Sequence, residues 1–144
     1  MTTIKQVLDR KGHDVWTIRQ DDSVFHALQE MAAKNIGALV VTKDDEPVGV
    51  FTERHYAREV FLKGRSSPMT LVKDVMVANF IYARPEQTVE QCLAVMTEKR
   101  VRHLPVLDQG RLIGLVSSGD LVNSIIDRQE FTIDQLTHYI AGSR

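Results

Sequence analysis

The chain has 144 residues, of which 43% are hydrophobic and 26% charged. This composition fits a globular protein that buries a core and argues against a disordered or fibrous chain. The formal charge of -1 argues against nucleic acid as the main partner, and the single Cys92 cannot form an intrachain disulfide. No apolar run reaches the length of a membrane span and no secretory signal is recognisable, so we expect a soluble, cytoplasmic protein without a membrane partner.

The chain contains an internal duplication. After a segment, Met1 to Lys11, that we expect to form a short helix or arm, Ser23–Tyr56 aligns without a gap on Thr88–Leu121, at a constant offset of 65 positions. Seven aligned pairs are identical: Val24 with Val89, Leu28 with Leu93, Met31 with Met96, Lys34 with Lys99, Leu39 with Leu104, Val41 with Val106 and Gly49 with Gly114. These are mainly apolar and turn positions, which indicates two copies of one structural unit.

Each copy is predicted to contain the same elements in the same order. An extended segment is followed by a helix whose first residue follows a capping hydroxyl, then by two short strands joined by a tight turn, then by a second helix. In the first copy the segments are Val15–Ile18, the helix from Ser23, Leu39–Val41, the turn at 44–47, 48–51, and a helix carrying Tyr56, Val60 and Phe61. In the second copy they are Phe80–Ala83, the helix from Thr88, Leu104–Leu107, the turn at 108–110, 112–116, and a helix carrying Leu121, Ile125 and Ile126.

The predicted fold is therefore an α/β (α+β) arrangement of two β-α-β-β-α repeats packed with pseudo-two-fold symmetry, with a short N-terminal arm and a C-terminal helix. A polar, turn-rich segment, Lys63–Pro68, forms the linker. Thr132 and Gln135 have the spacing of a capping box, which predicts the final helix. We divide the chain into repeat 1 with the arm (1–66), linker and repeat 2 (67–131), and the C-terminal helix (132–144).

Sequence signatures of catalysis are missing. There is no phosphate-binding glycine loop, no His-Glu-x-x-His and no complete nucleophile elbow, so we expect no enzyme, no catalytic residue and no catalytic cofactor. The five histidines and Cys92 lack metal-ligand spacing, which predicts no metal site. Cys92 lies in the apolar stripe of a predicted helix and is interpreted as a small core residue.

Polar residues gather where the last strand of the second copy meets its second helix. Ser117 and Asp120 have a spacing close to a capping box, and that alone explains both residues. Alternatively, the two carboxylate oxygens of Asp120 accept hydrogen bonds from both hydroxyls of a ribose, while Ser117 binds other polar groups of the ligand. Arg102 and His103 add cationic groups that could bind a phosphate; alternatively, Arg102 is a solvated surface arginine and His103 a histidine within a strand. The aligned positions of the first copy are Gly37 and Ala38.

Together these segments resemble a tandem pair of CBS domains, a Bateman module, of a stand-alone bacterial type. The resemblance covers nearly the whole chain and is carried by Asp74-Val75-Met76, by residues 101–106 and by residues 112–121. It implies a regulatory module that binds an adenosine compound such as AMP, ADP, ATP, S-adenosylmethionine or NAD between the repeats. Under this resemblance the ligand-binding residues are Asp120, Ser117, Ser118, Arg102, His103, Met76, Phe80, Ile81 and Pro105.

The first copy departs from the family pattern, because His55 stands where the ribose-binding aspartate belongs. A neutral imidazole offers one acceptor nitrogen, so we expect the second site, at Thr52, Arg54, His55, Thr17 and Ile18, to be weaker, altered or empty, and friendlier to an anion than an aspartate would allow. The favoured function is an adenine-nucleotide sensor that forms a homodimer and acts in trans on an unidentified protein effector. The alternative is a scaffold for protein association with empty clefts.

Overall fold

The computed structural model describes residues 1–129, and the predicted C-terminal helix after Thr132 lies outside them. The elements are α1 (Ile4–Lys11), β1 (Thr17–Arg19), α2 (Val24–Lys34), β2 (Ala38–Lys43), β3 (Glu46–Thr52), α3 (Glu53–Tyr56), the π-helical turn η1 (Ala57–Phe61), the 3-10 turn η2 (Val72–Asp74), α4 (Val89–Lys99), β4 (His103–Asp108), β5 (Arg111–Ser117) and a helix over 118–129. None of the helices in this part of the chain is both long enough and apolar enough to cross a membrane.

The predicted helix starts are confirmed. The Ser23 hydroxyl accepts a hydrogen bond from the His26 amide at the start of α2. At the start of α4, the Thr88 hydroxyl accepts from the Gln91 amide and the Gln91 side chain accepts from the Thr88 amide, which completes a capping box. These local bonds satisfy backbone donors that have no partner within the helix.

The two strand pairs have the predicted hairpin turns and the same irregularity. β2 pairs antiparallel with β3, and β4 with β5. Both two-residue turns have positive φ at each central residue, at Asp44 and Asp45 and at Gln109 and Gly110, as a type I′ turn requires. The register shifts after Val41 and at the aligned position after Val106. The duplication therefore extends to backbone geometry.

The first strands of the two repeats differ in extent. β1 pairs parallel with β2 over three residues and makes a three-stranded sheet. In the second repeat, Ala83 forms one parallel bridge to Val106, with its amide donating to the Pro105 carbonyl at 2.8 Å. The expected extended segment at Phe80–Ala83 is thus shortened to this bridge, and residues 79–81 are left available to line a cleft.

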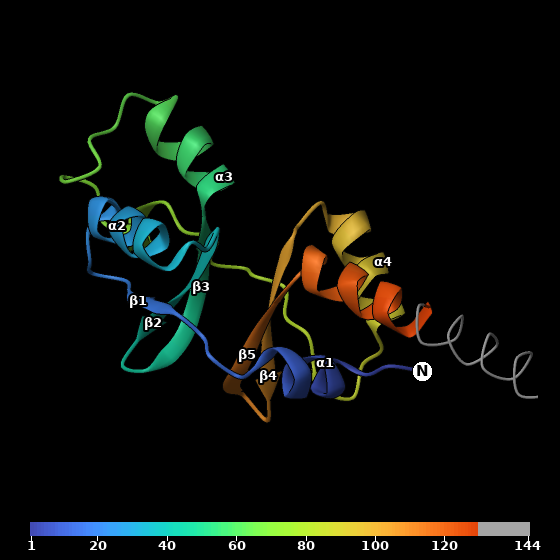
Figure 1. Ribbon diagram of the computed structural model, residues 1–144. Coiled ribbons are helices and arrows are strands. Elements are labelled where there is room, and N and C mark those ends of the chain that lie inside the picture. Colours follow the sequence, from blue (N-terminus) through green and yellow to red (C-terminus); the bar gives the residue numbers. More distant parts are fainter. Residues whose placement is uncertain (130–144) are drawn as a thin grey trace, which may run out of the picture.

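The segment before each repeat packs into the core of the other repeat. Figure 1 shows α1 beside β4 and β5, and the buried Ile4 and Leu8 belong to the core cluster of the second repeat. Conversely, Val72 and Val75 are buried in the core of the first repeat. Each repeat therefore completes its hydrophobic core with a segment that precedes the other repeat in the sequence. This exchange of segments joins the two repeats. The division at residues 66 and 131 remains a prediction about the sequence repeats.

The identical glycine pair of the duplication marks this crossover. A Cβ atom on Gly114 would lie 2.6 Å from a methyl carbon of Leu8, and one on Gly49 would lie 2.6 Å from the sulfur of Met76. Both distances are shorter than side-chain contacts allow. Glycine therefore fits both positions, because a large side chain from the segment before a repeat, Leu8 or Met76, packs directly against the backbone of the strand.

Candidate ligand-binding cleft between the repeats

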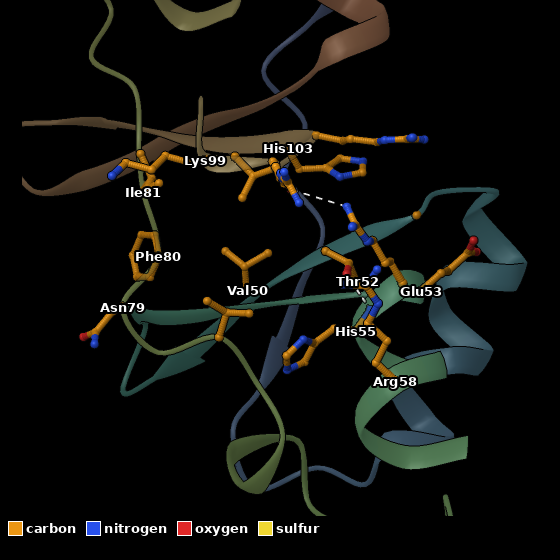
Figure 2. A pocket seen from close by; sticks show the side chains of 16 residues that line it. Val50, Thr52, Glu53, His55, Arg58, Asn79, Phe80, Ile81, Lys99 and His103 are labelled. Atoms are coloured by element: carbon orange, nitrogen blue, oxygen red, sulfur yellow. Dashed lines mark hydrogen bonds between the residues drawn. The ribbon is translucent and has the colours of Figure 1, made fainter. Parts of the chain in front are cut away.

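A cleft of about 570 Å³ opens where the first repeat faces the second. Its lining residues come from the end of β3 and the start of the following helix, from the segment after η2, and from the junction of α4 and β4: Gly37, Val50, Thr52, Glu53, Arg54, His55, Arg58, Val77, Asn79, Phe80, Ile81, Lys99, Arg100, Val101, Arg102 and His103. Figure 2 shows Phe80 and Ile81 along one side and Thr52, His55 and Arg58 along the other. The volume lies within the usual range for small-molecule sites.

Hydrogen bonds fix the polar side of the cleft. The Thr52 hydroxyl accepts from the His55 amide at 3.0 Å and so caps α3, and the Glu53 amide donates to the Gly37 carbonyl at 3.1 Å. The Arg54 guanidinium donates to the Arg100 carbonyl at 3.3 Å. That last bond joins the two repeats across the cleft.

Five permanently cationic side chains line the cleft, against the single carboxylate of Glu53: Arg54, Arg58, Lys99, Arg100 and Arg102. Within residues 1–129 none of the five forms a salt bridge. The protein as a whole carries a formal charge of only -1, so this concentration does not follow from composition. A cleft of this charge attracts anions.

The other side of the cleft is apolar. Val77 exchanges two backbone hydrogen bonds with Val50, at 3.0 and 2.9 Å, which holds the chain after η2 against β3. Phe80, Ile81 and Val101 continue this surface. An apolar wall with an aromatic ring, facing clustered cations, is suited to a ligand with a flat ring at one end and phosphate at the other.

His103, like His55, is a partly buried histidine that lines the cleft. Burial lowers its pKa, and the nearby positive charges of Lys11 and Arg102 add to this effect, while Asp120 and Glu53 oppose it. The lowered pKa favours the neutral form of the imidazole. Its ring also packs close to Gly37, where an added Cβ would lie 3.8 Å away.

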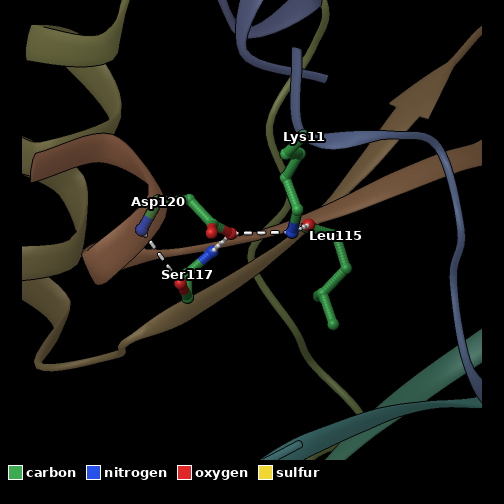
Figure 3. A network of polar contacts seen from close by, with 4 residues as sticks. All are labelled: Lys11, Leu115, Ser117 and Asp120. Carbon is green, nitrogen blue, oxygen red and sulfur yellow. Dashed lines mark hydrogen bonds and ion pairs between the residues drawn. The ribbon is translucent and has the colours of Figure 1, made fainter. Parts of the chain in front are cut away.

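Asp120 forms a capping box and an ion pair. Its Oδ2 accepts from the Ser117 amide at 2.8 Å, and its own amide donates to the Ser117 hydroxyl at 3.1 Å, so the capping interpretation is realised. As Figure 3 shows, Lys11 of α1 donates to the same Oδ2 at 2.7 Å and to the Leu115 carbonyl at 2.8 Å. Burial raises the pKa of Asp120, but the hydrogen bonds from Lys11 and Ser117 outweigh it, and the net pKa is lowered.

The structure brings together residues that the sequence assigned to two different sites. Arg102, His103, Phe80 and Ile81, predicted around Asp120, line the same cleft as Thr52, Arg54 and His55.

The other predicted residues lie outside that lining. Met76 packs against the first core, Pro105 and Ile18 are buried in strands, Thr17 is exposed on β1, and the Ser118 amide donates to the Arg102 carbonyl.

Several residues that line the cleft were not predicted from the sequence as site residues. Arg58 lies one helical turn after Arg54, and Lys99 and Arg100 immediately precede Val101 and Arg102. The run of cations at 99–102 is visible in the sequence, whereas its position opposite Arg54 and Arg58 depends on how the repeats pack.

Neither a metal centre nor a reactive thiol emerges from the described residues. No group of three or more His, Cys, Asp or Glu side chains in residues 1–129 is suited to hold a metal ion. Cys92 is buried in the second core, and burial raises the pKa of its thiol.

Comparison with known proteins agrees with this architecture. The CBS domain model matches residues 4–61 and 72–127. The chain belongs to the CBS-domain family. It is 37% identical to the mitochondrial CBS domain-containing protein CBSX3 of Arabidopsis thaliana over 98% of this chain and 73% of that protein. A CBS-domain structure from Burkholderia ambifaria MC40-6 is 48% identical, with a TM-score of 0.85 over 89% of this chain and 96% of that one.

A more distant structure shares the fold. The CBS domain pair of MJ0100, solved in complex with 5′-methylthioadenosine and S-adenosyl-L-methionine, is 21% identical, with a TM-score of 0.78 over 89% of this chain and 98% of that one. The protein is thus a CBS domain pair, and its α/β fold with two β-α-β-β-α repeats is confirmed.

Proposed function

We propose that this CBS domain pair is a regulatory module that binds an adenine nucleotide, such as AMP, ADP, ATP or NAD, in the cleft between the repeats and acts in trans on a partner protein. The observation that carries the proposal is the combination, in one cleft, of an apolar wall with cations that form no salt bridge within residues 1–129. Val50, Phe80 and Ile81 provide contacts for an adenine ring, and the arginines facing them provide charge-assisted hydrogen bonds for phosphate oxygens. MJ0100, which has the same fold, holds adenosine compounds.

We assign the main site to this cleft rather than to Asp120. The sequence favours a stronger site at Asp120 and a weaker one at His55, and that ranking remains a prediction. The distribution of charge favours the reverse, because the arginines gather around His55 while Lys11 is hydrogen-bonded to Asp120. A ligand ribose at Asp120 would have to share its carboxylate with Lys11.

A thermal-shift panel tests the proposal. Protein refolded without ligand is heated with AMP, ADP, ATP, NAD, NADH or S-adenosylmethionine. A ligand at 100 times its dissociation constant stabilises the folded state by about 2.7 kcal/mol, which raises the melting temperature by several degrees in a protein of this size. We expect at least one adenine nucleotide to give this shift.

Two matched variants locate the binding site. Arg102→Gln removes a cation from the cleft and should abolish most of the shift, whereas Arg111→Gln removes an exposed cation at the start of β5, outside the cleft, and should leave it intact. If wild type responds to no adenine nucleotide, the proposal fails and the scaffold alternative gains support. Equal responses of the two variants would place the site elsewhere.

We also propose that the module works as a homodimer associated through the second helices of its repeats. Phe61 and Ile126, which occupy aligned positions in these helices, are 68% and 43% exposed, and Leu62 and Val122 add to the exposed apolar surface. Light scattering after size exclusion should give twice the chain mass, and Phe61→Glu with Ile126→Glu should give the monomer mass. A monomeric wild type would contradict this assignment.

A further inference from the structure

The cations of the cleft exceed what one phosphate group can pair with. A phosphate monoester carries close to two negative charges and three acceptor oxygens at neutral pH. The cleft presents five permanent cations, in two groups. Arg54 and Arg58 lie one turn apart in the first repeat, and Lys99, Arg100 and Arg102 follow one another in the second. The positive charge of the two groups together exceeds the negative charge of a single phosphate.

Within residues 1–129 no salt bridge neutralises this charge. By contrast, Lys34 lies 2.9 Å from Glu30 and Lys63 lies 2.6 Å from Glu59. The one carboxylate among the lining residues, that of Glu53, extends away from Phe80 and Val50 in Figure 2. The excess charge is therefore available to a ligand. Since the five cations are exposed, their attraction for an anion is sensitive to salt.

The duplication shows that the shared fold does not require these cations. At the positions 65 residues away, the other repeat has Gly119 for Arg54, Asn123 for Arg58, Lys34 for Lys99, Asn35 for Arg100 and Gly37 for Arg102. Lys34, the one cation retained there, is paired with Glu30 and lies 4.4 Å from the centre of the Trp16 ring. Among these five aligned positions, all within the described residues, there is thus no second cluster of cations without a carboxylate partner, and the two repeats differ in charge here.

From this asymmetry we infer that the cleft selects a nucleoside polyphosphate, one per chain, whose phosphate chain lies between the two groups of cations. This inference rests on the proposed function and names the ligand class for the same site. The phosphate chain would pair with Arg54 and Arg58 at one end and with Arg100 and Arg102 at the other. Binding then joins the repeats through charge as well as through the Arg54 hydrogen bond to the Arg100 carbonyl.

Isothermal titration calorimetry with adenosine, AMP, ADP, ATP and inorganic tripolyphosphate tests the inference, without magnesium and at two salt concentrations. Each added charge-assisted contact is worth about tenfold in affinity, so ATP should bind at least about tenfold more tightly than AMP at low salt, with one site per chain. Higher salt should reduce this ratio. Arg58→Gln should weaken ATP more than AMP, and Arg111→Gln should change neither affinity.

The outcomes separate the inference from the proposed function. If AMP binds as tightly as ATP, or if two ATP molecules bind per chain, the inference is overturned while the nucleotide-binding function stands. If tripolyphosphate binds as tightly as ATP and AMP does not bind, the cleft is an anion site without adenosine recognition and the proposed function fails. If none of the ligands binds, both fail.

Discussion

The contact between Leu8 and Gly114 gives the most direct test of the crossover between repeats. In Gly114→Ala the new Cβ would lie 2.6 and 2.7 Å from the two methyl carbons of Leu8, about an ångström closer than ordinary contact. Leu8 is fully buried, so it has little room to move. Overpacking of this kind costs about 1–3 kcal/mol, and the lower backbone entropy of alanine in the unfolded chain offsets about 0.4–1 kcal/mol. We expect a net destabilisation of about 1–2 kcal/mol.

A double-mutant cycle measured by urea unfolding checks this value. Leu8→Ala alone should cost about 2–5 kcal/mol, because it leaves a cavity in the second core. Gly114→Ala should then cost almost nothing further, since the methyl groups it meets are gone, which gives a coupling energy of about 1–2 kcal/mol. Gly119→Ala is the control, because its Cβ would lie 3.6 Å from the nearest atom. Additive effects of Leu8→Ala and Gly114→Ala would refute the packing of α1 on β5.

Three further predictions concern titratable side chains. Lys11→Met should lower the free energy of unfolding by about 1 kcal/mol and raise the pKa of Asp120 in an NMR titration, whereas Lys11→Arg should restore both. Because burial lowers the pKa of folded His103, wild type should lose stability relative to His103→Gln as the pH falls below the ordinary value of 6.5; a constant difference between pH 7.5 and 5.5 would contradict this. Cys92, whose pKa burial raises, should react with a thiol reagent in native protein far more slowly than in urea; equal rates would show that it is exposed.

Much of the fold could be predicted from the sequence because its signals are local. Ser23 and Thr88 cap helices through bonds to amides three residues away, and the hairpin turns are set by a few consecutive residues. The aligned glycines, Gly49 and Gly114, are one of the identical pairs that indicate the duplication. Their structural role follows only from the side chains of Met76 and Leu8 that pack against them.

The candidate site was predicted only in part. Arg102, His103, Phe80 and Ile81 line the same cleft as Thr52, Arg54 and His55, whereas the sequence assigned the two sets to separate sites. Their part in ligand binding stays a prediction. The assignment to two sites treated each repeat separately, whereas the cleft combines the β3–α3 junction of the first repeat with residues 77–81 and the α4–β4 junction of the second.

The sequence by itself determined the two repeats, their element order and their capped helices, because periodicity, capping and turn chemistry act over a few residues. Only the tertiary structure decided that α1 packs with the second repeat, that Lys11 pairs with Asp120, and that Arg54 and Arg58 face the cations at 99–102. The physical reason is that contacts between segments far apart in sequence depend on the packing of both cores together, and no local pattern encodes which distant surface a side chain will meet.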